Sequence, residues 1–181
     1  MEVQKKNDKL VADLLLDLAS KDMKILASAL KRVRSKGTEK VIPSLISIIE
    51  NCEEANLAQE AKNIILELKS TASIPYLLEV LENHENSEIR ELVLSSFWQT
   101  GFNAHQHIEK FVTAAIKGSY MEAFEAYTVI DNLEGPFDEE PIMEAQLVLK
   151  SYFATDNEED EKFEIIKNIA KQLANYELTI Q

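Results

Sequence analysis

The amino-acid sequence predicts an all-helical repeat protein made of about five antiparallel helix pairs. A proline-containing helix start, Ile42-Pro43, recurs 32 residues later as Ile74-Pro75. Apolar side chains between such starts are spaced by three and four residues, which is the period of an amphipathic helix and not of a strand. The 181 residues include only four glycines and four prolines. This is too few for a sheet-rich fold with many tight turns.

Start and stop residues delimit the repeats. Proline is tolerated in the first turn of a helix, and glycine suits the left-handed residue just beyond a helix end. The expected stops, which follow apolar runs, are Gly37, Ser70, Gly101 and Gly135. We therefore expect one repeat domain over 1–181. Its repeats, each a helix A followed by a helix B, are 1–36, 37–69, 70–101, 102–135 and an irregular 136–181.

Side chains that can cap a helix mark the expected start of helix B in four repeats. An N-cap oxygen accepts a hydrogen bond from an N–H group of the first turn that has no partner within the helix. The predicted caps are Ser20, Asn56, Ser87 and Ser119. Glu122 follows Ser119 by three residues, which is the capping-box pattern.

Charge is unevenly distributed along the chain. There are 19 basic and 32 acidic residues, a net charge of −13, with +4 in 1–40 and −17 in 41–181. An acidic body repels phosphates, and only 31–40 is strongly basic, so we do not expect a nucleic-acid partner. The N-terminus lacks the apolar core of a signal peptide, and no segment reaches the ~20 apolar residues of a membrane span. The expected location is the cytoplasm.

Patterns typical of catalysis, cofactors or metals are missing from the sequence. It contains neither a glycine-rich phosphate loop nor a Gly-x-Ser-x-Gly elbow. His105 and His107 have no clear third ligand. The single Cys52 lies among acids, which disfavour a thiolate, and is expected to be a small buried hydrophobe. The acidic run 156–161 is explained by a solvated loop and a helix start. We expect a non-catalytic protein without cofactor or metal.

Two segments resemble the HEAT-repeat family of armadillo-type helical repeats. Ile42-Pro43-Ser44-Leu45 and Ile74-Pro75-Tyr76-Leu77 resemble the family's start of helix A. Residues 86–93, with Arg90 after an aliphatic residue, are similar to its helix B. The resemblance is best over 37–101. The fourth repeat lacks the proline, and only the third has the arginine. The resemblance implies a right-handed superhelix with helix B on the concave side, and most often a binding scaffold.

The same resemblance admits two enzymatic alternatives. HEAT-like DNA glycosylases that act on alkylated purines use tryptophans and an aspartate in a basic groove. Here Trp98 is the only tryptophan, and basic residues cluster only in 31–40. HEAT-like lyases that attach bilin pigments to proteins are the other alternative, and no residue of this sequence anchors that analogy.

One stripe of helix B, at positions i, i+4 and i+8, changes from polar to apolar along the chain. It comprises Gln59, Asn63 and Glu67 in the second repeat, Arg90, Leu94 and Trp98 in the third, and Glu122, Ala126 and Ile130 in the fourth. Exposed apolar surface marks interaction sites. Two interpretations follow. The favoured one is that these side chains are covered, either by the C-terminal helix pair or because Trp98 turns into the stack. The other is a partner-binding groove formed by Arg90, Leu94, Trp98 and Ile130.

The alignment of helix B also predicts ion pairs between neighbouring repeats. It places Arg34 opposite Glu67, and Arg90 opposite Glu122. As surface pairs, each would contribute about 0–1 kcal/mol.

The first helix is apolar over a wide arc for an end repeat, which normally needs a polar outer face. Another protein, of unidentified kind, is the expected partner. A homo-oligomer formed through a terminal repeat is the alternative.

Overall fold

The protein is all-helical in a computed structural model, which describes residues 2–36, 38–155 and 157–180. These residues form ten α-helices and contain no strand, so the predicted all-α class is confirmed. Each expected repeat holds two helices. The helices are α1 (Glu2–Leu18), α2 (Met23–Lys36), α3 (Ile42–Asn51), α4 (Ala55–Leu66), α5 (Ile74–Asn83), α6 (Ser87–Thr100), α7 (Ile108–Lys117), α8 (Tyr120–Asp131), α9 (Glu139–Phe153) and α10 (Phe163–Glu177).

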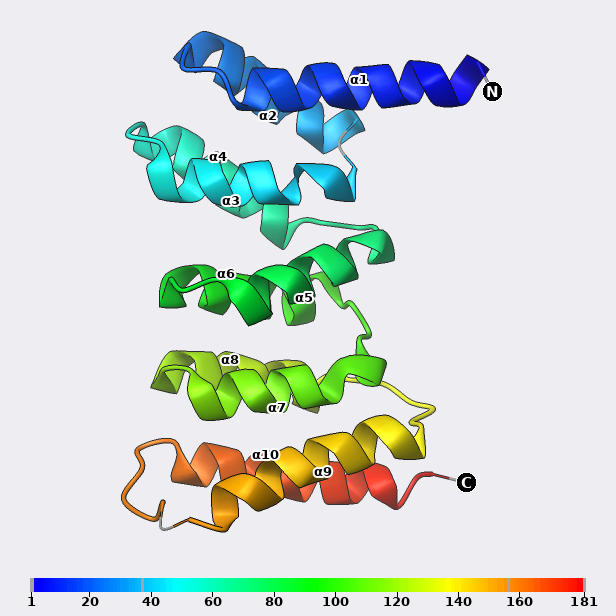
Figure 1. Ribbon diagram of the computed structural model, residues 1–181, viewed down its shortest axis with the longest axis vertical. Coiled ribbons are helices and arrows are strands. Elements are labelled where there is room, and N and C mark those ends of the chain that lie inside the picture. Colours follow the sequence, from blue (N-terminus) through cyan, green and yellow to red (C-terminus); the bar gives the residue numbers. More distant parts are fainter. Residues whose placement is uncertain (1, 37, 156, 181) are drawn as a thin grey trace. The chain divides into compact units, whose positions relative to one another are not determined.

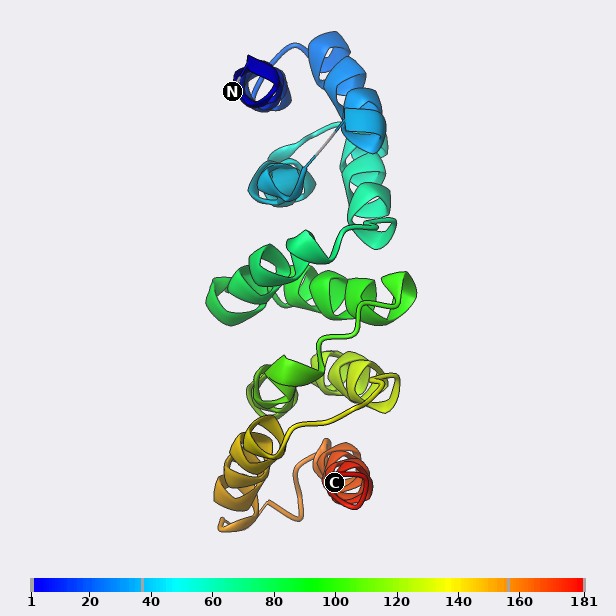
Figure 2. The ribbon, with the colours of Figure 1, turned by 90° about the vertical axis from the view of Figure 1, so that its right-hand side faces the viewer.

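Residue contacts divide the chain into two units, Met1–Leu77 and Leu78–Gln181, called unit 1 and unit 2 below. In unit 1, α1 packs on α2 and α3 on α4, while α1 also contacts α3 and α2 contacts α4. In unit 2, α7 packs on α8 and α9 on α10, with further contacts between α7 and α9, α6 and α8, and α8 and α10. Figures 1 and 2 show the resulting two layers within each unit. Odd-numbered helices form one layer and even-numbered helices the other.

A short 3₁₀ turn precedes three of the A helices, and the sequence did not indicate it. The turns are Glu39–Val41, Thr71–Ser73 and His105–His107, and each leads directly into α3, α5 or α7. Pro43 lies in the first turn of α3, as predicted. Its missing N–H removes no hydrogen bond there.

Two of the predicted helix-end signals are confirmed. Ser119 caps α8, where its hydroxyl accepts from the N–H of Glu122 and the Glu122 carboxylate accepts from the N–H of Ser119. Gly101 ends α6 with a φ of 70°, the left-handed conformation that favours glycine.

The remaining helix-B caps lie elsewhere than predicted. Asn86 caps α6, so Ser87 is the first helical residue. Asn56 lies inside the first turn of α4. Before α2, the carboxylate of Asp22 and not Ser20 accepts from a first-turn N–H, at 2.8 Å. In each helix the residue at the N-cap position lies one or two residues away from the predicted one. Residue type alone did not decide between the two positions.

Two of the predicted stops do not end helices. Ser70 caps the 3₁₀ turn before α5, four residues after α4 has ended. Gly135 lies in the loop after α8, beyond Asp131. Gly37 lies outside the described residues. Cys52, expected to be buried, is half-exposed at the end of α3 and directs its thiol at the carbonyl of Glu54.

The core of unit 2 consists of apolar side chains at helical spacing. Phe97 and Phe111 pack edge to face with ring centroids 5.0 Å apart. Such a pair contributes about 0.5–1.5 kcal/mol beyond its buried area. Other large side chains fully buried in this unit include Leu94, Ile108, Ile130, Ile142, Ile166, Ile169 and Leu173.

The acidic loop between α9 and α10 is held by polar contacts with the rest of unit 2. Asp160 accepts from the hydroxyl of Tyr152 at 3.0 Å. Burial, together with this carboxylate, raises the pKa of Tyr152 to about 12. Lys162 donates to the carbonyls of Ile116 and Gly118 at 2.7 and 2.8 Å. A cation there complements the negative end of the α7 dipole.

Candidate functional site

The four residues of the candidate partner-binding groove do not form one exposed stripe. Leu94 and Ile130 are fully buried, and Trp98 is 39% exposed. Arg90 is half-buried and bonded to neighbours in unit 2. The groove interpretation is therefore wrong for Leu94 and Ile130.

The packing of α6 on α8 explains this outcome. Leu94 is fully buried in α6, and Glu122, Ala126 and Ile130 are buried in α8. The predicted stripe therefore follows sides of the two helices that face the interior of unit 2, and only Arg90 and Trp98 are partly exposed.

The C-terminal helix covers Ile130, as the favoured interpretation of the sequence predicted. The hydroxyl of Tyr176 in α10 donates to the carbonyl of Ile130 and lies 3.3 Å from that of Leu133. Phe137 stacks on the Tyr176 ring with centroids 3.9 Å apart. The end of α8 is therefore part of the core of unit 2.

Arg90 and Glu122 form the centre of a polar junction between α6 and α8. Arg90 Nε donates to Glu122 Oε1, as predicted, and its Nη1 donates to the carbonyls of His84 and Glu85 at 2.6 and 2.9 Å. Glu122 Oε2 accepts from the hydroxyl of Ser87 at 2.7 Å. The predicted pair is thus present, but it is not a surface pair because Glu122 is only 1% exposed.

The environment of Glu122 favours its ionised form. Burial alone would raise the pKa of this carboxyl. Hydrogen bonds from Arg90, from the N–H of Ser119 and from Ser87 outweigh burial, so the pKa is lowered. Gly118 makes room for this side chain, because a Cβ at that position would lie 2.7 Å from Ala114 O and from Glu122 Cβ.

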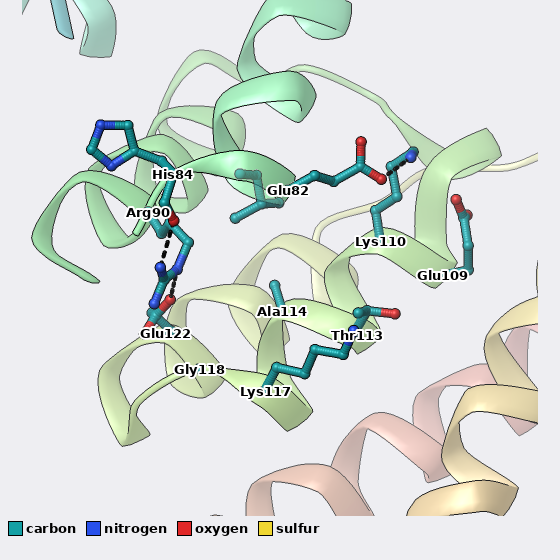
Figure 3. A pocket seen from close by; sticks show the side chains of 11 residues that line it. Glu82, His84, Arg90, Glu109, Lys110, Thr113, Ala114, Lys117, Gly118 and Glu122 are labelled. Carbon is teal, nitrogen blue, oxygen red and sulfur yellow. Dashed lines mark hydrogen bonds and ion pairs between the residues drawn. The ribbon is translucent and has the colours of Figure 1, made fainter. Parts of the chain in front are cut away.

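A cavity of about 460 Å³ lies beside this junction (Figure 3). Arg90 and Glu122 lie at one end, and the ion pair of Lys110 with Glu82 lies at the other. Its charged lining consists of three basic residues, Arg90, Lys110 and Lys117, and three acidic residues, Glu82, Glu109 and Glu122. The charges balance, and Arg90 and Lys110 are already neutralised by carboxylates. The cavity is therefore polar but has no net attraction for an anion or a cation.

Exposed apolar side chains collect on the outer surface of α6 and α8. Trp98 is 39% exposed, Met121 48% and Phe124 47%. The indole Nε1 of Trp98 donates to Glu125 Oε2 at 2.6 Å and so fixes the ring against α8. We call Trp98, Met121, Phe124 and Glu125 the Trp98 face. Apolar side chains of this size on a surface mark a contact region.

The sequence pattern pointed to Trp98 but not to Met121 and Phe124. The two are spaced i, i+3, which puts them on one side of α8. The predicted stripe of α8, Glu122, Ala126 and Ile130, lies on the buried side of that helix and so does not include them. At the corresponding stripe of α4, Gln59 and Glu67 are exposed and polar, as predicted.

The helices that bear the Trp98 face are acidic. Together α6 and α8 contain five acidic residues and one arginine, and that arginine is bonded to Glu122. In contrast, α2 contains five basic residues and no acid. The face therefore presents a negative potential around an apolar centre.

Among the described residues, no group of three or more histidines, cysteines or acids is placed to hold a metal ion. His105 instead lies edge-on to Phe137, with ring centroids 6.0 Å apart. No helix in the described ranges is both long and apolar enough to cross a bilayer.

No protein-family model matches the chain, and neither a curated protein nor a solved structure matches it.

Proposed function

We propose that the chain is a non-catalytic helical scaffold that binds another protein through the Trp98 face. The observation that carries this proposal is the exposure of Trp98, Met121 and Phe124 on adjacent helices of unit 2. Aromatic side chains dominate interface energies because they remove a large apolar area from water. A stack of helices holds such side chains at fixed positions before the partner arrives, which lowers the entropic cost of binding.

The architecture that we propose is a right-handed, HEAT-like solenoid of five helix pairs. Its support is the pattern of contacts inside each unit, where α1 meets α3 and α2 meets α4 in unit 1, and α7 meets α9 and α8 meets both α6 and α10 in unit 2. Stacking of this kind lets each pair cover the apolar side of its neighbour. We also propose a cytoplasmic location, because a single cysteine cannot form an internal disulfide and suits a reducing compartment.

The two enzymatic alternatives have less support. Phosphate binding needs several unpaired cations, and Trp98 is bonded to a carboxylate on an acidic pair of helices. An electrophoretic shift with duplex DNA at low salt would favour the glycosylase-like alternative over the scaffold. No arrangement among the described residues of unit 2 favours the pigment-lyase alternative.

Site-specific photo-crosslinking in the native cell tests the proposal. A photo-reactive phenylalanine analogue replaces Met121, and a control chain carries it at the exposed position Glu79 of α5. We expect one reproducible protein adduct from position 121 that position 79 does not give. The Trp98→Ala substitution should remove that adduct while cooperative unfolding is retained. Identical adducts at both positions, or none at 121, would overturn the proposal.

Self-association through a terminal helix is a second candidate. It is favoured by two exposed leucines, Leu16 of α1 at 72% and Leu147 of α9 at 57%. Light scattering over a range of concentrations tests it. A mass that rises with concentration, and that returns to the monomer value in Leu147→Ser, would support pairing through α9.

A further inference from the structure

We propose that the segment that docks on the Trp98 face is an amphipathic helix with lysine or arginine flanking an apolar anchor. This inference rests on the proposed function and specifies the chemistry of the partner. Three features of unit 2 carry it: the charge around the face, its length along α8, and its lack of backbone hydrogen-bonding groups.

The charge around the face selects a basic partner. Glu88 and Asp131 are exposed on α6 and α8, and Glu125 lies within the face itself. Only Oε2 of Glu125 is engaged by another described side chain, the Trp98 indole, so Oε1 is available to a donor. The one cation on these two helices, Arg90, is already committed to Glu122. A lysine or arginine beside an apolar anchor would therefore meet unmatched carboxylates, whereas an acidic segment would be repelled.

The apolar centre has the dimensions of a short helix. Met121, Phe124 and the half-exposed Thr128 lie along one side of α8 at i, i+3 and i+7. This stretch spans two turns, or about 10 Å. A docking helix uses anchors at the same spacings. Methionine adapts to a partner's side chains because its unbranched thioether has several rotatable bonds.

The backbone of the face excludes pairing by strand addition. The described part of the chain contains no strand, and the peptide groups of α6 and α8 are bonded within their helices. A partner therefore binds through side chains alone. A helix suits this mode because its own backbone groups are satisfied internally, whereas an extended peptide would lose hydrogen bonds to water.

Two synthetic peptides test this inference on the full chain. One is an amphipathic leucine–lysine helix, and the other has the same leucines with glutamate in place of lysine. Neither contains tryptophan, so the emission of Trp98, the only tryptophan in the protein, reports occupancy. We expect saturable binding of the lysine peptide and roughly tenfold or weaker binding of the glutamate peptide.

Matched variants separate docking on the face from general attraction to an acidic protein. Phe124→Ser and Glu125→Gln should each weaken binding of the lysine peptide severalfold. The glutamine retains an acceptor for the Trp98 indole, so only the charge is lost. Met143→Ser and Glu144→Gln remove an exposed methionine and an exposed acid on α9 and should leave affinity unchanged. Far-UV circular dichroism confirms that each variant is folded.

Each remaining outcome has a defined meaning. Equal binding of both peptides, weakened by Phe124→Ser, would overturn the basic partner and leave the protein-binding face in place. No binding of either peptide, or binding unaffected by Phe124→Ser, would overturn both this inference and the proposed face. Trp98 emission that changes with protein concentration alone would identify a second copy as the occupant and overturn the basic partner.

Discussion

The Arg34 cluster of unit 1 and the Arg90 junction of unit 2 have the same chemistry in different surroundings. In both, an arginine of one B helix bonds a glutamate of the next helix pair, Glu67 at the C-cap of α4 or Glu122 in α8. Arg34 also bonds Glu60 at 2.8 Å. The exposed fractions of the side chains are 37% and 56% for Arg34 and Glu67, but 22% and 1% for Arg90 and Glu122.

The difference in burial changes what each pair does. Water screens the charges of the Arg34 cluster, so the pair gains little over two hydrated ions. Glu122 has lost its water and depends on Arg90, Ser87 and the N–H of Ser119 for all its hydrogen bonds. Removing a partner from such a buried carboxylate leaves an uncompensated charge. The contribution of an ion pair to stability is therefore set by its burial and not by its place in the repeat.

Replacing Arg90 with methionine should have the largest effect on unit 2. The variant keeps most of the apolar stem but leaves Glu122 without its cation, so we expect the free energy of unfolding to fall by about 3–5 kcal/mol. Urea denaturation followed by Trp98 fluorescence measures it, because Trp98 lies in α6, the helix that carries Arg90. A loss below about 1 kcal/mol would mean that the pair behaves as an exposed one.

Gly118→Ala tests the same junction through packing. The added methyl group would meet a backbone carbonyl, Ala114 O, and the Cβ of Glu122 at 2.7 Å. Neither atom can move without shifting its helix, so we expect a loss of about 1–3 kcal/mol by the same measurement. Unchanged stability would show that α7 and α8 separate easily and that Glu122 is less confined than its burial indicates.

The junction should also make unit 2 sensitive to acid. The pKa of Glu122 in the folded protein is lower than its ordinary value of 4.5. A carboxyl with a lowered pKa contributes stability that is present above that ordinary value and is lost as the pH falls through the folded pKa. Wild type should therefore be more stable than Glu122→Gln at neutral pH, and the gap should narrow below pH 4.5.

Urea midpoints of the two proteins over a pH series measure this gap. The pKa of Asp160 is also lowered, by its bonds to Lys162 and Tyr152. Because Asp160 is present in both proteins, its effect on stability is the same in both and does not change the gap. A gap that stays constant down to the lowest pH would contradict a lowered pKa of Glu122.

These two clusters also show what could be predicted from the sequence. Both arginine–glutamate pairs followed from the repeat spacing, because neighbouring B helices place equivalent positions side by side. Their burial did not follow. It depends on the groups that close around Glu122, such as Arg90 and Ser87 of α6. It also depends on α10, whose packing on α8 involves residues far away in the sequence.

The Trp98 face was predicted in part for the same reason. Trp98 was found because a lone tryptophan on a helix stripe is conspicuous. Met121 and Phe124 were missed because the stripe in α8 was placed on its buried side. Leu94 and Ile130 were included because periodicity alone does not decide which side of a helix faces the interior. The class of fold depends on periodicity, whereas a surface depends on the position of each residue.

Arg34→Met, matched to Arg90→Met, should have the smallest effect. The substitution removes bonds to Glu60 and Glu67, but all three side chains stay accessible to water, so we expect a loss of at most about 1 kcal/mol that shrinks further in high salt. Trp98 fluorescence reports unit 2, so amide hydrogen exchange of α2 and α4 is the suitable measurement. A loss of several kcal/mol, close to that of Arg90→Met, would contradict the conclusion that burial sets what each pair contributes, because the two pairs differ in exposure.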